Sequence, residues 1–332
     1  MLKRKLGYSD LELTTVGFGA WAVGGGNWDW GWGVQDDRES IEAIHKALDL
    51  GINWIDTAAA YGLGHSEEMV GKAIQGKRDQ VIIATKCSLI WDGRTDGTVG
   101  HRLKAWSVRK EAENSLKRLG VDVIDLYQIH WPNPEEEIEE GWAEIARLVE
   151  EGKVRYGGVS NFSVEQIKKV QKIHPVASAQ PQYSMLERSP EKELLEYCDQ
   201  QKIGVIVYSP MASGLLTGKY NNGIPEGTRV SLSGYEWLRE RFEDEETQKQ
   251  IAQVRELTEV AKKLGCSTAQ LAIAWCLKNP DVSTVITGAS RGSQVQENMK
   301  ALEVSNQLTP EVLEQIENVL NNKPAPQPNY RE

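Results

Sequence analysis

The feature that most constrains this chain is a regular alternation of helix-like segments and short apolar runs joined by glycine. Residues 107–119 (SVRKEAENSLKRL) end in a basic pair and meet Gly120 before an apolar run begins. Basic residues in a last turn, followed by glycine, are typical of helix ends. The same order occurs around Gly51 and Gly204. Alternation of this kind predicts parallel strands covered by helices.

Eight strand-like runs follow one another along the chain, and each leads into a loop and usually a helix. They read TTVGFG, INWID, QVIIATK, VIDLYQIH, VRYGGVS, ASAQ, GVIVYS and STVIT. Eight such units over roughly 300 residues favour an α/β fold closed into a (β/α)8 TIM barrel rather than an open sheet.

Three further segments complete the expected architecture. The opening KRKLGYSDLELTTVG predicts an N-terminal β-hairpin that could cap the bottom of the barrel. Residues 211–246, after the seventh strand, are too long for an ordinary connector, so long βα loops are expected at the C-terminal face. The tail NNKPAPQPNYRE is proline-rich and is expected to wrap the surface. We expect a single domain over residues 1–332.

Composition argues against several classes of function. The net charge of −10 argues against a nucleic-acid surface, which needs clustered Lys and Arg. The opening MLKRKLGYSDLEL lacks the apolar stretch of a secretory signal, and no apolar run is long enough to span a membrane. The four cysteines show no C-x-x-C spacing, which favours free thiols and a cytoplasmic location. The histidines lack metal-ligand spacing, so no metal is expected.

Three short motifs resemble ligand or catalytic signatures and do not fit them. Residues 17–22 match G-x-G-x-x-A, but VGGGNWDWGWGV follows, and the next helix is expected only near Asp37. Residues 288–292 match the esterase G-x-S-x-G, yet no histidine follows the serine, since the last one is His174. That junction is still a good anion cradle. Residues 214–220 have the wrong spacing for a P-loop.

Four polar residues lie at, or just after, the carboxyl ends of the second, third and fourth strands. Asp56 ends INWID and Tyr61 lies five residues further on, Lys86 ends VIIATK, and His130 ends DLYQIH. Taken singly, each has an ordinary structural interpretation, as a helix cap, a solvated cation or a structural histidine. The carboxyl ends of barrel strands converge at one mouth, where active sites lie. We therefore expect the four side chains to meet there.

Together these residues can supply a proton to a carbonyl oxygen during reduction. Tyr61 can donate the proton, although a free phenol with a pKa near 10 is a reluctant donor. A cation beside it lowers the phenol pKa, and a carboxylate holds that cation in place, which are the expected roles of Lys86 and Asp56. His130 can hydrogen-bond the substrate oxygen.

At this point the chain resembles the aldo-keto reductase superfamily, whose catalytic tetrad consists of Asp, Tyr, Lys and His. Other matching pieces are GFGAW, DTAAAYG, GVSNFS, AQPQYS, YSPMASGLLTGKY, TAQLAIAWCL and ITGAS…QVQEN. The stretch KYNNGIPEGTRVSLSGYEWL and the C-terminal region are especially similar to voltage-gated potassium channel β subunits, which belong to the same superfamily. Those channel subunits carry Asn in vertebrates where this chain has His130, so the resemblance favours a proficient reductase.

The resemblance implies an NADPH (NADP+) site spread over the strand ends. The nicotinamide end would be held by Asp56, Ser160, Asn161, Gln180 and Tyr208, with Ala20 and Trp21 lining the mouth. The pyrophosphate would follow Ser209, Pro210, Met211, Gly214 and Lys219. The adenosine and its 2′-phosphate would lie among Gly288, Ser290, Arg291, Gln294, Glu297 and Asn298. Family members often carry a basic residue where this chain has Ser290, so Arg291 must reach the 2′-phosphate, and NADPH is preferred over NADH.

Tryptophans near the expected mouth suggest the substrate class. Those predicted to contact substrate are Trp21, Trp30, Trp32, Trp91 and Trp131. They could form an apolar wall for aromatic or medium-chain carbonyl compounds, or they could only fold the long loops down. The function expected is NADPH-dependent reduction of aldehydes and ketones.

Two alternatives stay open: a nicotinamide-sensing regulatory subunit of a membrane channel, and a sugar or polyol dehydrogenase working in the oxidative direction. Self-association into a homo-oligomer also stays open.

Overall fold

The computed structural model describes residues 1–26, 28–31, 33–92, 96–231 and 236–325. Its residues form two compact units. Unit 1 comprises residues 1–181, 193–208 and 281–296, and unit 2 comprises residues 182–192, 209–280 and 297 onward. A single domain over residues 1–332 stays a prediction.

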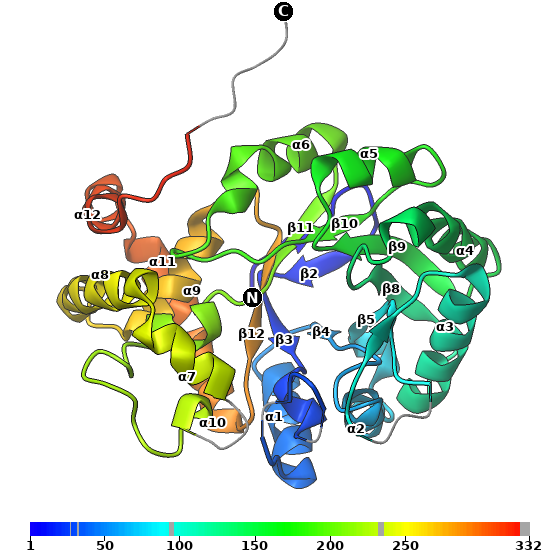
Figure 1. Cartoon of the computed structure of the whole chain (residues 1–332), viewed down its shortest axis with the longest axis horizontal. Helices are drawn as coiled ribbons and strands as arrows, with labels where there is room; N and C mark the ends of the chain where they lie inside the picture. Colours follow the sequence, from blue (N-terminus) through cyan, green and yellow to red (C-terminus); the bar gives the residue numbers. More distant parts are fainter. Residues whose placement is uncertain (27, 32, 93–95, 232–235, 326–332) are drawn as a thin grey trace, which may run out of the picture. The chain divides into compact units, whose positions relative to one another are not determined.

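Within the described part of unit 1, eight parallel strands form a closed barrel (Figure 1). In hydrogen-bonded order they are β10 (Ser178–Gln180), β11 (Gly204–Val207), β12 (Thr284–Gly288), β3 (Val16–Gly19), β4 (Trp54–Asp56), β5 (Ile82–Cys87), β8 (Ile124–Ile129) and β9 (Val154–Ser160). Each strand overlaps one of the eight expected runs. The prediction of a (β/α)8 barrel is therefore confirmed.

Helices alternate with these strands and cover the outside of the barrel (Figure 1). They are α1 (Asp37–Asp49), α2 (His65–Ala73), α3 (Ala105–Leu119), α4 (Ile138–Glu150), α5 (Val164–Gln171) and α6 (Leu194–Gln201). Helix α1 begins at Asp37, as expected, because the Asp36 side chain accepts hydrogen bonds from the N–H groups of residues 38 and 39. Only a short 3-10 helix, η1 (Ala22–Gly24), follows β3 directly. The rejection of the dinucleotide fingerprint is thus supported.

Glycine ends two of the three helices for which the sequence predicted it. Gly120 caps α3 in the left-handed conformation at φ 64°, and Gly51 follows α1 at φ 88°. The third expectation is wrong: Lys202, at φ 55°, caps α6, and Gly204 is the first residue of β11. A side chain on Gly204 would place its Cβ 2.4 Å from a methyl of Leu6. Gly204 is therefore required by close packing rather than by the helix end.

The N-terminal hairpin is present as expected, with β1 (Lys3–Lys5) paired antiparallel to β2 (Glu12–Thr14). Its side chains Leu6, Leu11 and Leu13 are buried in one core cluster with barrel residues such as Trp54 and Leu126. Burial of apolar surface of this kind is worth about 1.5–3 kcal/mol for each leucine. The hairpin thus contributes directly to the barrel core.

The connection from β5 to α3 contains a small sheet that the sequence did not predict. Here β6 (Leu89–Ile90) pairs antiparallel with β7 (Gly100–His101). A short 3-10 helix, η2 (Arg78–Gln80), precedes β5, and η3 (Glu135–Glu137) precedes α4.

Unit 2 is helical in its described residues. It contains η4 (Ser189–Lys192), η5 (Ala212–Thr217), η6 (Arg229–Ser231), α7 (Glu236–Glu243), α8 (Glu245–Lys263), α9 (Thr268–Lys278), α11 (Ala301–Gln307) and α12 (Pro310–Leu320). Helix α10 (Gly292–Met299) begins in unit 1 and ends in unit 2. The long connection expected at 211–246 corresponds to η5, η6, α7 and the start of α8. The end of the proline-rich tail, residues 326–332, lies outside the described residues.

A buried arginine, Arg188, connects three segments of unit 2 through its side-chain contacts. The Arg188 side chain is 5% exposed and pairs with Glu191 and Glu317 at 2.8 and 2.6 Å. Its guanidinium also lies 5.2 Å from the centre of the Trp275 ring. These contacts tie the segment that carries η4 to α9 and α12.

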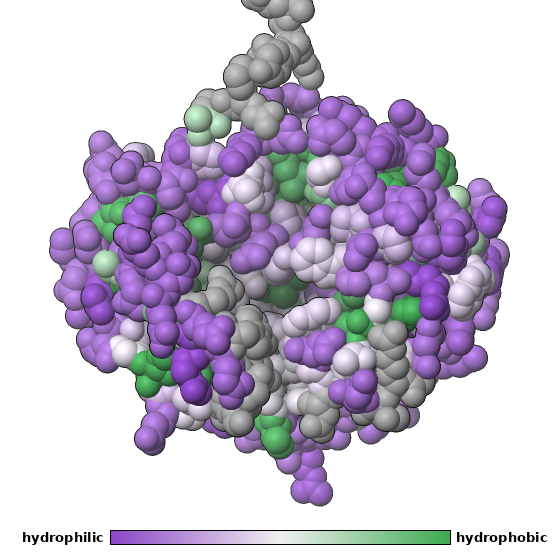
Figure 2. All heavy atoms as spheres, in the orientation of Figure 1, coloured by the Kyte–Doolittle hydropathy of each residue, from purple (hydrophilic) through white to green (hydrophobic). Residues whose placement is uncertain are grey.

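Hydrophilic side chains cover most of the visible surface (Figure 2), in keeping with a sequence in which 26% of the residues are charged. Among the described residues, no helix has the length and apolar character needed to cross a lipid bilayer.

Candidate active site

Lys86, at the carboxyl end of β5, is the centre of the candidate site. Its side chain is fully buried, and its ammonium donates to Asp56 Oδ1 at 2.5 Å, the carbonyl of Thr57 at 2.9 Å and Tyr61 Oη at 3.3 Å. A lysine ammonium has three N–H donors, and each has a partner here. The ammonium also lies 5.0 Å from the centre of the Tyr61 ring. Asp56, Lys86 and Tyr61 are thus brought together as expected.

Asp56 is held on its other side by two buried amides. Its Oδ2 accepts from Gln180 Nε2 at 2.9 Å and from Gln128 Nε2 at 3.4 Å, and Gln180 Nε2 also donates to Gln128 Oε1 at 3.2 Å. Gln128 was not predicted from the sequence. The sequence does show Gln128 as a polar residue within the apolar run VIDLYQIH. In the structure, both faces of this strand are buried. Gln128 therefore links the tetrad to a residue of the expected nicotinamide set.

Tyr61 lies in the loop between β4 and α2, among aromatic rings. The His130 ring is 5.6 Å away at 76°, and the Trp28 ring is 5.9 Å away at 40°. The loop itself is fixed by the Thr57 and Ser66 hydroxyls, 2.9 Å apart, and by a bond from Ser66 Oγ to the Ala20 carbonyl. His130 is therefore next to Tyr61, which completes the expected group of four.

The electrostatic balance at Tyr61 differs from the expectation. Burial raises the pKa of Tyr61 above its ordinary value, while Lys86 acts to lower it and Asp56 to raise it. Lys86 thus acts in the predicted direction, but desolvation outweighs it, and the phenol keeps its proton at neutral pH. Burial acts to lower the pKa of Lys86, and Asp56 and Tyr61 outweigh this effect, so that the pKa is raised and the amine stays charged.

His130 is neutral in this environment. Burial is the largest cause of a pKa well below the ordinary 6.5, followed by the charges of Lys86 and His101. A neutral imidazole has one N–H donor and one acceptor nitrogen. The backbone of His130 is fixed by a bond from its N–H to the Cys87 carbonyl at 3.0 Å and by one from Asn161 Nδ2 to its own carbonyl, also at 3.0 Å.

The residues expected to hold the nicotinamide carboxamide form one hydrogen-bonded group. Ser160 Oγ donates to the Gln180 carbonyl at 2.9 Å, Asn161 Nδ2 donates to Ser160 Oγ at 3.1 Å, and Tyr208 Oη donates to Asn161 Oδ1 at 2.7 Å. Asn161 adopts a positive φ of 62°. Since Asn161 bonds to His130 and Gln180 bonds to Asp56, this group is continuous with the tetrad. Ala20 joins it through its N–H, which donates to the Asp56 carbonyl at 2.8 Å.

The residues expected around the adenosine begin with Gly288, the last residue of β12. Gly288 is exposed, and Gln294 Oε1 accepts from the N–H and the hydroxyl of Ser290 at 2.8 and 3.1 Å. The Arg291 side chain is 67% exposed and lies 3.5 Å from a carboxylate oxygen of Glu39. Arg291 thus has an acidic neighbour, on α1, that the sequence did not indicate.

In unit 2, the expected pyrophosphate segment has an unusual backbone. Ser209, Ala212 and Ser213 have φ of 54°, 47° and 53°, and Gly214 has φ of 98°. A right-handed residue followed by a left-handed one, as at Met211 (φ −99°) and Ala212, points successive N–H groups to one side, which favours anions. Lys219 lies beside Gly214, because a Cβ on that glycine would be 3.2 Å from its ammonium. The remaining members of the set are Pro210 and Asn298, which are buried, Met211, which is half-buried, and Glu297, whose carboxylate accepts from Gln270 at 3.1 Å.

The expected substrate tryptophans have different surroundings. Trp21 packs with Trp28 and Tyr61, and Trp30, 39% exposed, meets Trp28 edge-on at 6.0 Å. Trp131 follows His130 and is 41% exposed. Trp91 instead lies 5.7 Å from the Arg118 guanidinium of α3, and Trp32 lies outside the described residues. Trp28, absent from the expected substrate set, has its ring 5.9 Å from that of Tyr61.

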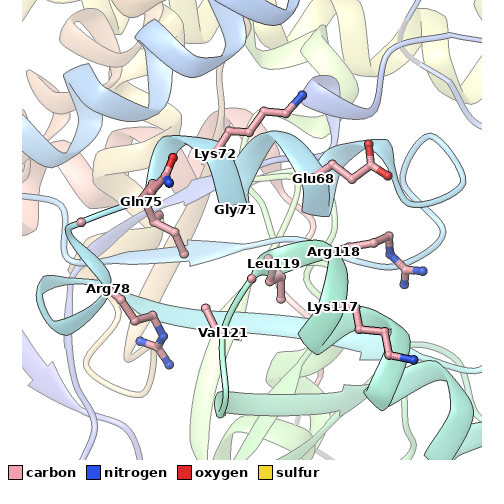
Figure 3. Close-up of a pocket in the computed structure, with 12 residues that line it drawn as sticks. Glu68, Gly71, Lys72, Gln75, Arg78, Lys117, Arg118, Leu119 and Val121 are labelled. Carbon is pink, nitrogen blue, oxygen red and sulfur yellow. The ribbon is translucent and has the colours of Figure 1, made fainter.

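A separate groove of about 550 Å³ lies between the C-terminal ends of α2 and α3 (Figure 3). Lys72, Arg78, Lys117 and Arg118 line it. Residues 78 and 121 precede β5 and β8, so this groove lies toward the amino ends of these strands, opposite Lys86 and His130. It is not part of the candidate site.

Comparison with known proteins agrees with this arrangement. The model of the aldo/keto reductase family matches residues 15–321. Aldo-keto reductase YhdN of Bacillus subtilis is 41% identical, with 86% of this chain and 84% of that protein covered. The Arabidopsis thaliana protein named "Probable voltage-gated potassium channel subunit beta" is 37% identical over the whole of both chains.

Among solved structures, the glycerol dehydrogenase AKR11B4 of Gluconobacter oxydans superposes with a TM-score of 0.82 and 34% identity, covering 99% of this chain and 98% of that one. The chain therefore belongs to the aldo/keto reductase family, whose members are oxidoreductases that generally use nicotinamide cofactors.

Proposed function

We propose that this protein reduces aldehydes and ketones to alcohols with NADPH, and that Tyr61 is the proton donor. One observation carries the proposal: the buried Lys86 ammonium binds both the Asp56 carboxylate and the Tyr61 hydroxyl. A phenol in contact with a fixed cation can release its proton to a developing alkoxide, since the cation stabilises the phenolate that remains.

Each of the four residues has a distinct role in this proposal. Tyr61 keeps its proton until the carbonyl oxygen becomes basic, because burial raises its pKa. Lys86 stabilises the phenolate, and Asp56 holds Lys86 in position. Neutral His130 donates its N–H to the substrate oxygen and orients the carbonyl toward Tyr61.

The donor set fits a nicotinamide cofactor. The amide oxygens of Asn161 and Gln180 can accept from the NH2 group of a carboxamide, and Tyr208 supplies an aromatic ring beside them. When bound, the nicotinamide supplies the hydride that the carbonyl carbon receives. Within unit 2, the backbone of residues 209–214 suits a phosphate group. Arg291 supplies the charge for a 2′-phosphate, which is the reason for proposing NADPH over NADH.

We further propose that the substrate is a small aromatic or medium-chain carbonyl compound and that the protein acts in the cytoplasm. Trp21, Trp30 and Trp131 supply the apolar surface, since each is partly exposed in the described part of unit 1.

Oxidation of a polyol is the second candidate, because the structural neighbour at 34% identity is a glycerol dehydrogenase. The same Tyr61 and Lys86 would serve that direction as base and electrostatic support.

Steady-state turnover of a carbonyl panel tests the proposal. Purified protein is assayed with NADPH or NADH against aromatic, medium-chain and small polar aldehydes and ketones, and in reverse with glycerol and other polyols plus NADP+. We expect the highest kcat/KM with NADPH and the larger apolar aldehydes. A higher kcat/KM for polyol oxidation would favour the second candidate. Turnover of no carbonyl, together with co-purification of a membrane protein, would favour a channel subunit.

A further inference from the structure

Glu111 is a buried carboxyl group outside the set of four residues to which the proposed function assigns a role. It lies on the inner face of α3 and is 9% exposed. Its Oε2 accepts from the backbone N–H of Ser88 at 3.0 Å, and its Oε1 accepts from Ser107 Oγ at 3.1 Å. Burial raises the pKa of Glu111 to about 8, against the opposing effects of these two hydrogen bonds and of Arg102 and Arg118. Placing a carboxyl group here is costly, so its bond to Ser88 calls for an explanation.

Ser88 is held in a conformation that a serine rarely adopts. It follows β5 directly, and its φ is 88°. Three hydrogen bonds fix it: its N–H donates to Glu111, its carbonyl accepts from the Arg102 N–H at 3.1 Å, and its Oγ accepts from the Trp131 N–H at 3.2 Å. A residue with a strained backbone needs several contacts to hold it in that conformation. The hydrogen bond to Glu111 is one of the three that hold Ser88.

The bonds of Ser88 connect the strand ends that carry two of the tetrad residues. Ser88 lies two positions after Lys86, and Trp131 lies one position after His130. The neighbouring Cys87 carbonyl accepts from the His130 N–H at 3.0 Å. The ends of β5 and β8 are therefore joined by the Cys87–His130 bond at their last ladder pair, Cys87 and Ile129, and by the Ser88–Trp131 bond one residue further on.

We propose that Glu111 is a positioning residue for the reaction. By accepting from the N–H of Ser88, Glu111 fixes the residue that follows β5 and keeps the Ser88 hydroxyl in reach of the Trp131 N–H. In this way it sets the placement of Lys86 relative to His130. This inference rests on the proposed function. A displacement of about 1 Å between reacting groups is enough to reduce turnover by up to two orders of magnitude.

The test compares two replacements of Glu111 with a matched buried carboxylate. Glu111→Ala removes the acceptor for the Ser88 N–H, whereas Glu111→Gln keeps an oxygen that can accept it. Glu144, on α4, is 3% exposed and bonds only Arg109 and Arg147 among the contacts described, so Glu144→Ala is the control. We expect Glu111→Ala to lower kcat by about 10- to 100-fold with the KM for NADPH unchanged. Glu111→Gln and Glu144→Ala should stay within about twofold of the wild type.

Backbone hydrogen exchange supplies a measurement that needs no turnover. Exchange of the Ser88 and Trp131 amides should accelerate in Glu111→Ala and not in Glu144→Ala. Should wild-type protein turn over no carbonyl, the proposed function fails, while the exchange rates still decide the role of Glu111. Unchanged exchange, or a kcat in Glu111→Gln as low as in Glu111→Ala, would overturn the inference.

A second variant covers the case in which Glu111→Ala does not fold. Ser88→Ala leaves Glu111 in place and removes only the side-chain bond to Trp131. It should lower kcat with little effect on the KM for NADPH. A kcat equal to that of the wild type would overturn the inference.

Discussion

The two ends of the same barrel strands each bury a carboxylate with cations, and only one end is suited to chemistry. At the carboxyl ends, Asp56 is 3% exposed and binds Lys86. Toward the amino ends, Asp125 is also 3% exposed, and its two oxygens accept from Arg155 and from Arg78, each at 2.8 Å. Burial and ion pairing are thus alike at both ends.

The difference lies in what the cation does with its remaining donors. Arg78 donates its other N–H groups to the carbonyls of Val81 and Val123, which only fixes the backbone. Lys86 donates to Tyr61, whose hydroxyl can give up a proton. Of these two buried ion pairs, only the one that contains Lys86 extends to a group that can transfer a proton.

Replacing that proton donor should give the largest effect. Tyr61→Phe removes the hydroxyl and keeps the ring, so we expect kcat to fall by about 10³-fold or more, as for loss of a general acid. Binding of NADPH, followed by its fluorescence, should be unchanged. A variant that kept most of its kcat would refute the role of Tyr61.

Matched replacements of Asp56 and Asp125 test whether the two buried carboxylates differ in their effect on turnover. Asp56→Asn weakens the hold on Lys86, and we expect kcat to fall about 100-fold. Asp125→Asn leaves Arg78 and Arg155 without their carboxylate, and because both arginines are partly exposed, it should cost about 3 kcal/mol or less of unfolding free energy. Its kcat for folded protein should match the wild type. Urea unfolding and steady-state kinetics measure the two effects, and a loss of kcat in Asp125→Asn would remove the distinction drawn here.

Glu111 differs from Asp56 and Asp125, because the hydrogen-bond partners of its buried carboxyl group carry no charge. Its pKa is raised to about 8, so the folded state keeps a proton that the unfolded chain releases near its ordinary pKa. Stability should therefore fall as the pH rises from about 4.5 to 8, by at most about 1.4 kcal/mol for each pH unit. The ionisable groups facing it are Cys87, Arg102, Arg118 and Tyr127.

Glu111→Gln lacks this proton and keeps those neighbours, so its unfolding free energy should lose less than that of the wild type over the same pH range. Urea titrations at pH 5, 6, 7 and 8 measure the difference. Parallel curves for the two proteins would contradict it.

The smallest expected effect concerns the exposed Arg291. Arg291→Ala should weaken NADPH binding about tenfold, or about 1.4 kcal/mol, and leave NADH binding unchanged. Because Glu39 lies 3.5 Å from Arg291, Glu39→Gln should tighten NADPH binding slightly. Titrations with both cofactors measure these changes. Equal losses for NADPH and NADH in Arg291→Ala would argue against a 2′-phosphate contact.

Much of the fold could be predicted because local chemistry and global topology agree. Gly120 after a basic helix end and the eight apolar runs each pointed to the element found. The convergence of Asp56, Lys86 and His130 followed from parallel strands alone.

The unpredicted features depend on contacts between distant segments. Gly204 was assigned to a helix end because its close packing against Leu6 is not visible in the local sequence. Gln128 was overlooked because only the closed barrel brings it to Asp56. The net rise in the Tyr61 pKa depends on burial, which residue types and spacing do not specify.

The complete hydrogen bonding of the Lys86 ammonium has a chemical consequence for the proposed reduction of aldehydes. A lysine amine condenses with an aldehyde only through a free lone pair, which requires loss of a proton. Here three acceptors hold all three N–H groups, and the pKa is raised, so the nitrogen has no electron pair to offer. The lysine can thus lie beside reactive carbonyls through many turnovers without being consumed as an imine.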